Sequence, residues 1–255
     1  MGEVRRRMEL TDATGAKRRA LYEHPAPVRL AHWAIAIALP ILVLSGLEIF
    51  RAFPSFGPKI PQDDFVAVPR ALTLGGWLAG GIQWHFTFAW LFLGAGALYL
   101  VYQIASGNFR QVLFAPRDLR GVVPMIRHYL RGTPPPAYPG AYNPLQKLAY
   151  TMTLASGGLA ALTGLCLLQP VQLGWLVALF GGFRMVRIWH FLAMLGLVAF
   201  VPGHLLMVVL HGWNNLRSML TGFQLEPAHQ DSARPPSDGT EPGPREAGNP
   251  PPPAP

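Results

Sequence analysis

Two histidines, His190 and His204, lie fourteen residues apart in one apolar stretch, RIWHFLAMLGLVAFVPGHLLMVVLHG. In an α-helix, fourteen residues advance about 21 Å and make almost four full turns, so both imidazoles lie on one face. An imidazole surrounded by hydrocarbon is costly and requires a partner or a function. The spacing therefore indicates two metal-centred cofactors at different depths, with electrons passing between them.

Four long apolar segments could carry these residues across a bilayer: 31–50, 84–105, 147–169 and 188–210. The chain is 51% hydrophobic and only 13% charged, and its charges avoid these segments. Each segment has about the 20 residues that a transmembrane helix needs, whereas four such lengths in succession are rare as buried helices of a soluble protein. The sequence predicts an all-α fold, a transmembrane four-helix bundle.

The positions of lysine and arginine predict the orientation of this bundle. Sixteen of the 21 lie before the first segment, between the second and third, or after the fourth, and five lie in the other two connections. By the positive-inside rule, both termini and the 106–146 loop are cytoplasmic. This distribution accounts for the net charge of +8, so nucleic acid is not an expected partner. The first apolar run begins near Ala31, too far into the chain for a signal peptide.

The segments outside the spans divide the chain into three predicted parts. Residues 1–21 read as a flexible cytoplasmic lead, 22–222 as the membrane domain, and the proline-rich residues 223–255 as a disordered tail. No internal repeat is visible.

Two of the connections carry recognisable patterns. Residues 51–82 are rich in proline and glycine and predict turns. Within the 106–146 loop, DLRGVVPMIRHYLRG predicts a short interfacial helix with a basic side toward lipid headgroups. Between the third and fourth segments, GWLVALFGGF is apolar but too short to span, which predicts a re-entrant or surface-lying piece.

Two further histidines fall at depths that match the first two. His32 opens the first segment at the predicted cytoplasmic side, and His85 opens the second at the opposite side. By depth, His85 can face His190 and His32 can face His204. Two histidines from different helices at each level are the ligand set of a six-coordinate haem iron held in a helix bundle.

Other interpretations of these histidines remain open. Each could be a hydrogen-bonded helix histidine with no ligand. A structural zinc site fits poorly, because its ligands would gather at one point and usually include thiolates. Cys166 is the single cysteine, so a CxxCH attachment motif is absent and any haem is bound noncovalently.

Three more residues lie beside the four histidines. His211 is seven residues after His204 on nearly the same face, so it competes as a ligand or contacts a haem propionate at the cytoplasmic boundary. Arg29 and Arg187 lie near His32 and His190, one at each membrane face. They could supply cations to haem propionates or act as snorkelling anchors.

The chain resembles a known family in HPAPVRLAHW, in His85, in YNPLQK before the third segment, and in the His190/His204 pair, over about residues 22–222. The family is that of the four-helix, di-haem cytochrome b subunits of bacterial membrane oxidoreductases, in the prokaryotic cytochrome b561 superfamily. It includes formate dehydrogenase gamma subunits, Ni–Fe hydrogenase cytochrome b subunits and thiosulfate-reductase-type subunits. The resemblance implies a cytoplasmic haem b on His32 and His204, and a periplasmic haem b on His85 and His190.

The resemblance also implies a quinone site beside the cytoplasmic haem. Asn143, Gln146 and Lys147 of YNPLQK match the family's Asn-x-x-Gln segment at that site. An amide and a cation at a helix start can hydrogen-bond a quinone carbonyl and stabilise its reduced anion. Alternatively, Asn143 caps the helix and Lys147 is an interfacial lysine.

The resulting hypothesis is a quinone-reactive, two-haem subunit of the bacterial inner membrane. It would pass electrons, in either direction, between membrane quinone and a periplasmic or membrane-anchored catalytic subunit of the molybdenum, Ni–Fe or iron–sulfur type. One alternative is a stand-alone cytochrome b561-type oxidoreductase that transfers electrons from superoxide or another small donor to quinone. Another is a non-redox transporter or scaffold, which would need polar residues at mid-membrane, and the spans offer few besides the histidines.

Overall fold

The structure is a computed structural model. It describes seven stretches of the chain: 7–11, 17–52, 54, 56, 68–134, 136–138 and 142–227. By internal contacts the chain forms two units, one of residues 24–222 and one of residues 1–23 together with 223–255.

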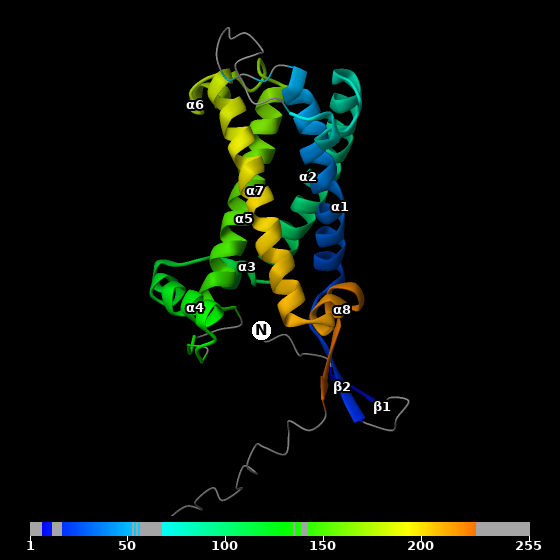
Figure 1. The fold of residues 1–255 in the computed structure, drawn as a ribbon, viewed down its shortest axis with the longest axis vertical. Helices are drawn as coiled ribbons and strands as arrows, with labels where there is room; N and C mark the ends of the chain where they lie inside the picture. The colour runs from blue at the N-terminus through cyan, green and yellow to red at the C-terminus, as the bar shows by residue number, and fades with distance from the viewer. Residues whose placement is uncertain are drawn as a thin grey trace, which may run out of the picture. The chain divides into compact units, whose positions relative to one another are not determined.

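Four long helices form the frame of the unit of residues 24–222 (Figure 1). They are α1 (Ala26–Ala52), α2 (Leu78–Ala105), α5 (Pro144–Leu168) and α7 (Phe183–His211). By length and composition, all four can cross a membrane. The four predicted spans and the all-α membrane fold are thereby confirmed.

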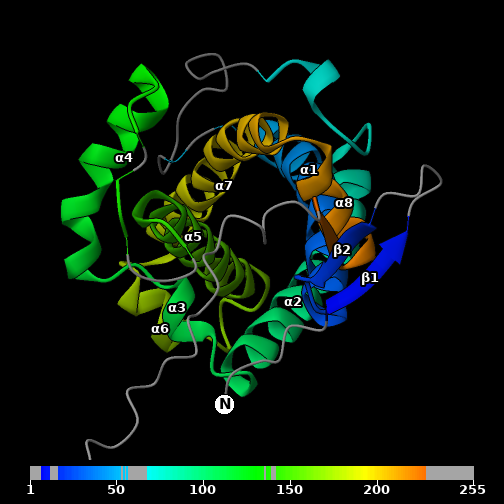
Figure 2. The ribbon, with the colours of Figure 1, turned by 90° about the horizontal axis from the view of Figure 1, so that it is seen from below.

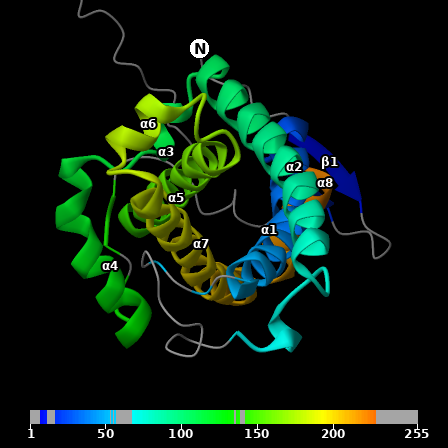
Figure 3. The ribbon, with the colours of Figure 1, turned by 90° about the horizontal axis from the view of Figure 1, so that it is seen from above.

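The long helices pack as two antiparallel pairs, α1 with α2 and α5 with α7 (Figures 2 and 3). On α1, the small residues Ala31, Ala38 and Ser45 are buried. They recur every seven residues, which is close to two helical turns, so they form one stripe along which another helix can approach. Many large apolar side chains elsewhere on the helices are exposed, for example Trp90 and Val101 on α2, as expected of surfaces that face lipid.

Six shorter elements connect the long helices or follow them. They are η2 (Arg70–Leu72), α3 (Phe109–Val112), η3 (Pro116–Asp118), α4 (Leu119–Arg131), α6 (Gly174–Leu179) and α8 (Trp213–Thr221). The apolar piece between the third and fourth spans contains α6. The proline-rich FPSFGPKIPQDDF stretch of the 51–82 connection lies almost entirely outside the described residues.

Helix α4 is the helix that the sequence predicted for DLRGVVPMIRHYLRG. One face packs on α5, and Met125 is buried there. A second face carries four exposed apolar side chains at helical spacing: Leu119, Val123, Ile126 and Leu130. Gly132 ends the helix with φ +63, a conformation that glycine adopts without strain. The attachment of α4 to a lipid surface stays a prediction.

The second unit contains a three-stranded antiparallel sheet in the order β1 (Arg7–Thr11), β2 (Lys17–Tyr22), β3 (Phe223–Pro227). The sequence predicts a flexible lead and a disordered tail in these segments, and the structure forms strands in a part of each. Ala20 and Leu21 of β2 are buried, and Tyr22 contacts Phe223 with ring centres 5.3 Å apart. The pairing joins segments about 200 residues apart, so no local pattern reveals it. The tail beyond 227 lies outside the described residues.

Candidate functional site

The structure brings the four histidines together as two pairs. His32 near the start of α1 lies opposite His204 near the end of α7, with ring centres 6.1 Å apart. His85 near the start of α2 lies opposite His190 near the start of α7, with ring centres 6.2 Å apart. These are the pairs that depth alone predicted. Each pair joins the α1–α2 hairpin to α7.

The imidazole of His85 is held by the facing turn of α1. Its Nδ1 lies 3.1 Å from the carbonyl oxygen of Leu42 and 3.2 Å from Oγ of Ser45. A carbonyl can only accept a hydrogen bond, so Nδ1 must carry the proton and donate it. The Ser45 hydroxyl donates to the Ile41 carbonyl at 2.6 Å, which leaves its oxygen to accept from Nδ1. In the neutral imidazole, Nε2 of His85 is then unprotonated and has a lone pair for a metal.

His190 is held in the same way by the facing turn of α5. Its Nδ1 lies 3.1 Å from the carbonyl oxygen of Ala160 and 3.1 Å from Oγ1 of Thr163. The Thr163 hydroxyl donates to the Leu159 carbonyl, so it too accepts from Nδ1. By the same reasoning, Nε2 of His190 has a free lone pair.

A glycine follows each supporting hydroxyl and admits the imidazole ring. A Cβ added to Gly46 would lie 3.2 Å from Cε1 of His85, and one added to Gly164 would lie 3.2 Å from Cε1 of His190. Both distances are tighter than ordinary van der Waals contact. This arrangement was not predicted from the sequence. A signal for it is present, since LSGL at 44–47 and LTGL at 162–165 share their pattern.

The His32/His204 pair has different surroundings. Nδ1 of His32 is buried and has no hydrogen-bond partner among the described residues. Its ring meets the edge of Trp33, with centres 5.2 Å apart. The His204 ring stacks on Phe200 at 5.3 Å and 22°, and no hydrogen bond joins it to the described part of the chain. Ring contacts rather than hydrogen bonds orient this pair.

Both pairs fit a metal ion bound between them. A metal–imidazole bond of about 2 Å on each side, together with the two ring radii, places ring centres roughly 6 Å apart. Among the described residues, no cluster of three His, Cys, Asp or Glu side chains could hold a metal ion. Two imidazoles on opposite sides, with the other ligands supplied by a macrocycle, make the donor set of a six-coordinate haem.

The two predicted arginines make protein contacts. Nη1 of Arg29 donates to the carbonyl oxygen of Leu220 at 2.7 Å, at the end of α8, while its Nε is buried without a partner. The guanidinium of Arg187 lies 5.9 Å from the centre of the Phe56 ring. Arg29 thus links the start of α1, near His32, to the end of α8, and Arg187 contacts the aromatic ring of Phe56. Their role toward a haem propionate stays a prediction.

Asn143 and Gln146 form a capping box at the start of α5. Oδ1 of Asn143 accepts from the backbone N–H of Gln146 at 2.8 Å, and Oε1 of Gln146 accepts from the backbone N–H of Asn143 at 3.0 Å. The capping role that the sequence left open is therefore present. It occupies both amide oxygens and leaves the amide nitrogens pointing elsewhere, with Nδ2 of Asn143 3.5 Å from the Tyr129 hydroxyl.

Lys147, in the first turn of α5, forms an ion pair with Asp118 of η3. Its Nζ lies 3.2 Å from Oδ1 of Asp118, and only about a tenth of each side chain is exposed. Asp118 also accepts from the backbone N–H of Ala115 at 2.8 Å. That backbone hydrogen bond, followed by the hydrogen bond and charge of Lys147, lowers the pKa of Asp118 below its ordinary value of 3.8.

Two of the remaining histidines, His128 and His24, make hydrogen bonds of their own. Nδ1 of His128 contacts the carbonyl oxygen of Thr133 at the end of α4. His24 donates its backbone N–H to the Gly222 carbonyl. The side chain of His211 and the whole of His229 lie outside the described residues, so the predicted competition between His211 and His204 stays open.

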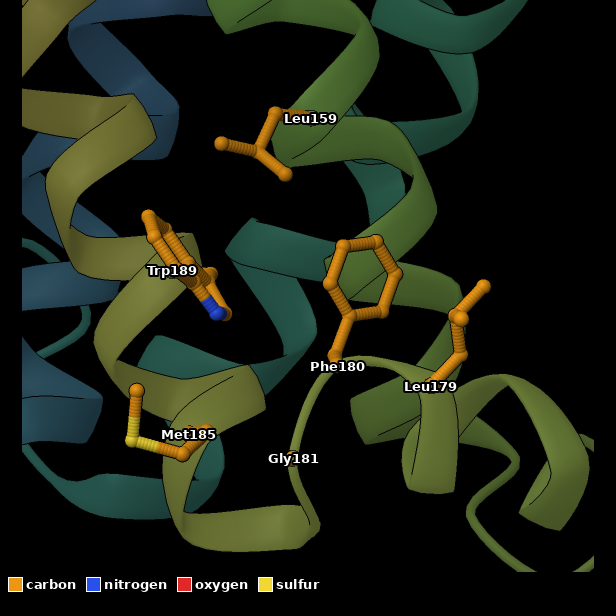
Figure 4. A pocket seen from close by; sticks show the side chains of 6 residues that line it. All are labelled: Leu159, Leu179, Phe180, Gly181, Met185 and Trp189. Atoms are coloured by element: carbon orange, nitrogen blue, oxygen red, sulfur yellow. The ribbon is translucent and has the colours of Figure 1, made fainter.

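A depression of about 450 Å³ lies against α5, α6 and α7 (Figure 4). It is lined by Leu159, Leu179, Phe180, Gly181, Met185 and Trp189. The lining is almost entirely apolar, and none of the four paired histidines contributes to it. The depression adjoins the turn of α5 that supports His190, because the carbonyl of its lining residue Leu159 accepts the hydrogen bond of the Thr163 hydroxyl. Its lining offers no reactive group.

Comparison with known proteins identifies the family. Residues 23–222 match the family described as prokaryotic cytochrome b561. A putative protein-methionine-sulfoxide reductase subunit YedZ1 of Azospira oryzae is 40% identical over 187 residues, which cover 73% of this chain and 90% of that protein.

Hydrogenase-associated cytochromes are also similar to the chain. A probable Ni/Fe-hydrogenase B-type cytochrome subunit of Cupriavidus necator is 29% identical over 75% of this chain and 80% of its own length. A protein of the same description from Azotobacter vinelandii is 28% identical over 76% of this chain and 82% of its own. The family match spans both histidine pairs and implies a membrane protein of electron transport that binds haem.

Proposed function

The chain belongs to the prokaryotic cytochrome b561 family, and from this premise we propose that it is a two-haem electron-transfer subunit linking membrane quinone to a catalytic redox partner. The observation that carries the proposal is the pair of facing imidazole couples, at 6.1 and 6.2 Å between ring centres. Four spans and haem binding follow from the family and the helices. The number of haems, their ligands, the quinone and the partner are proposals.

In this proposal, His32 and His204 bind one haem b and His85 and His190 bind the other. When bound, each haem supplies the one-electron chemistry of its iron. The chain orients the ligands, excludes water through its apolar helices and sets the spacing of the sites. His190 and His204 are fourteen residues apart on α7, so the two sites are separated by about 21 Å along that helix.

We place both termini and α4 on the cytoplasmic side of the inner membrane. The sixteen lysine and arginine residues on that side, against five on the other, support this orientation. The His32/His204 site then lies toward the cytoplasm, since α1 enters and α7 leaves the membrane there. The His85/His190 site lies toward the periplasm.

We place the quinone near the start of α5. The capping box fixes Asn143 and Gln146 through their oxygens, so their amide N–H groups can donate to a quinone carbonyl. Lys147 adds a cation that Asp118 holds in position. Proton uptake from the cytoplasm would accompany quinone reduction at this end.

The relatives point to two kinds of catalytic partner. One is described as a subunit of a protein-methionine-sulfoxide reductase and others as cytochrome subunits of Ni/Fe hydrogenases. A reductase partner would draw electrons from quinol, whereas a hydrogenase oxidising hydrogen would deliver them to quinone. Purification of the tagged full chain from its native membrane, followed by identification of any metal-containing protein that accompanies it, decides between the two directions.

The haem proposal is tested by counting haem per chain with the pyridine haemochrome assay. We expect two haems in the wild-type protein, one in His85→Ala, one in His204→Ala and none in the double variant. His128→Ala, outside both pairs, is the matched control and retains two. Absence of haem from the purified protein, or retention of both haems in His85→Ala and His204→Ala, would contradict the proposal.

A further inference from the structure

Resting on the proposed two-haem function, we propose that Ser45 and Thr163 are positioning residues that hold His85 and His190 with Nε2 toward the shared iron and lower the reduction potential of that haem. The two residues lie on different helices, α1 and α5, and support ligands on α2 and α7. They form equivalent supports on the two sides of a single site.

The supports agree atom by atom. In each, the hydroxyl belongs to a residue three positions after the one whose carbonyl accepts the bond, Leu42 before Ser45 and Ala160 before Thr163. Each imidazole Nδ1 therefore meets two oxygens of one helical turn, at 3.1 to 3.2 Å. Ser45 and Thr163 are fully buried, so water does not compete for these bonds.

A serine or threonine in an apolar helix commonly bonds only the carbonyl four residues earlier. Thr87 and Thr153 do this, at 2.8 Å from the carbonyl oxygens of Gln83 and Ala149. Ser45 and Thr163 make the same bond, and their oxygens additionally contact a histidine nitrogen. The second contact separates a positioning role from ordinary helix chemistry.

The hydroxyl oxygens also change what the imidazole gives to a metal. Donation of the Nδ1 proton to an acceptor makes the imidazole a stronger base at Nε2. A more basic axial ligand stabilises ferric iron relative to ferrous iron, which lowers the reduction potential. Because both ligands of the site have this support, the effects add on one iron, and the His32/His204 site receives none of it.

The test is a potentiometric titration of the haems in the full-length protein, in membranes, followed by optical absorption. The variants are Ser45→Ala, Thr163→Val and their combination, and Thr153→Val is the control because it removes a back-bonded hydroxyl from the same helix. We expect two one-electron transitions in the wild type. In the variants the transition of the His85/His190 site shifts upward, further in the double variant, and the other transition stays in place.

Conservative variants separate the hydroxyl from the shape of the side chain. Ser45→Thr and Thr163→Ser keep an acceptor oxygen and should keep the wild-type potential. If Thr163→Val loses its haem while Thr163→Ser retains it, the hydroxyl is again the cause. Equal shifts in Thr163→Val and Thr163→Ser, or shifts no larger than in Thr153→Val, would overturn the positioning role.

Failure of this inference is distinguishable from failure of the proposed function. A protein without two haems, by the pyridine assay, contradicts the function itself. If the variants retain two haems and their reduction potentials equal those of the wild type, only the role of Ser45 and Thr163 is contradicted. Electron paramagnetic resonance of the oxidised protein gives a second measurement, because an imidazole that has lost its hydroxyl acceptor changes the ferric signal of one site alone.

Discussion

The two histidine pairs differ in what holds their rings. At the His85/His190 pair, each Nδ1 donates to a carbonyl and a hydroxyl of the neighbouring helix, within about 3.2 Å. At the His32/His204 pair, Nδ1 of His32 is buried without a partner, and His204 stacks on Phe200. The ring separations are nevertheless almost equal, 6.2 and 6.1 Å.

The two pairs have equal ring separations but unequal hydrogen bonding, so the distance between the rings and the orientation of each ring have different causes. The helix packing sets how far apart the rings lie, since both pairs bridge the same two hairpins. The hydrogen bonds set which nitrogen is available and how strongly it binds. Hydrogen bonds thus pre-orient the His85/His190 pair, whereas ring contacts orient the His32/His204 pair.

The largest expected effect comes from filling the space beside a supported ring. In Gly164→Ala the new Cβ meets Cε1 of His190 at 3.2 Å, and overpacking of this kind costs about 1–3 kcal/mol. Haem occupancy of the His85/His190 site should fall severalfold, with the other site intact, as measured by haem content and potentiometric titration. Gly158→Ala, on the same helix with nothing within 4 Å, is the control. Equal occupancy in both variants would show that close approach to Gly164 is unimportant.

Much of the fold could be predicted because its signals are local. The apolar runs 31–50 and 84–105 are long enough to predict membrane spans, and the structure extends them into α1 and α2. The amphipathic pattern of α4 predicts a helix for the same reason. The pairing of β2 with β3 could not be predicted, since it depends on register between distant segments.

The histidine pairs follow from depth and topology, but their supports do not. Ser45 and Thr163 look in sequence like ordinary helix residues, and only the packing of α1 on α2 and of α5 on α7 shows that each faces an imidazole. Asn143 shows the opposite case. Its capping of α5 is readable from Asn-Pro-x-Gln alone, whereas a quinone contact needs neighbours that the sequence does not place.

The next effect concerns how fast each site releases its haem. A net gain of about 0.5–1.5 kcal/mol for a hydrogen bond, at each of two ligands, predicts roughly tenfold slower release from the His85/His190 site. His204→Ala retains only that site and His190→Ala only the other, so haem transfer from each variant to apomyoglobin measures the two sites separately. Faster release from the His85/His190 site would reverse the comparison.

A smaller effect is expected at the His32/His204 pair alone. The guanidinium of Arg29 donates to the Leu220 carbonyl at the end of α8, and a cation at a helix C-terminus contributes about 0.3–1 kcal/mol. Arg29→Gln should accelerate haem release from this pair by about two- to fivefold. The release rate at the His85/His190 pair, measured in the His204→Ala background, should not change. Arg127→Gln, on the exposed face of α4, is the control.

The smallest effect lies outside both pairs and tests their independence from α4. The folded-state pKa of Asp118 is below its ordinary value of 3.8, so its stabilising contribution is present above about pH 4 and is lost as the pH falls through the lowered pKa. Asp118→Asn should therefore increase amide hydrogen exchange in α4 at pH 7, as expected for loss of the ion pair with Lys147. Acidification of the wild type through the lowered pKa of Asp118 should remove the difference between the two proteins. The haem spectra of Asp118→Asn should match those of the wild type at pH 7. A spectral change would show that the ion pair of Asp118 with Lys147 reaches a ligand pair.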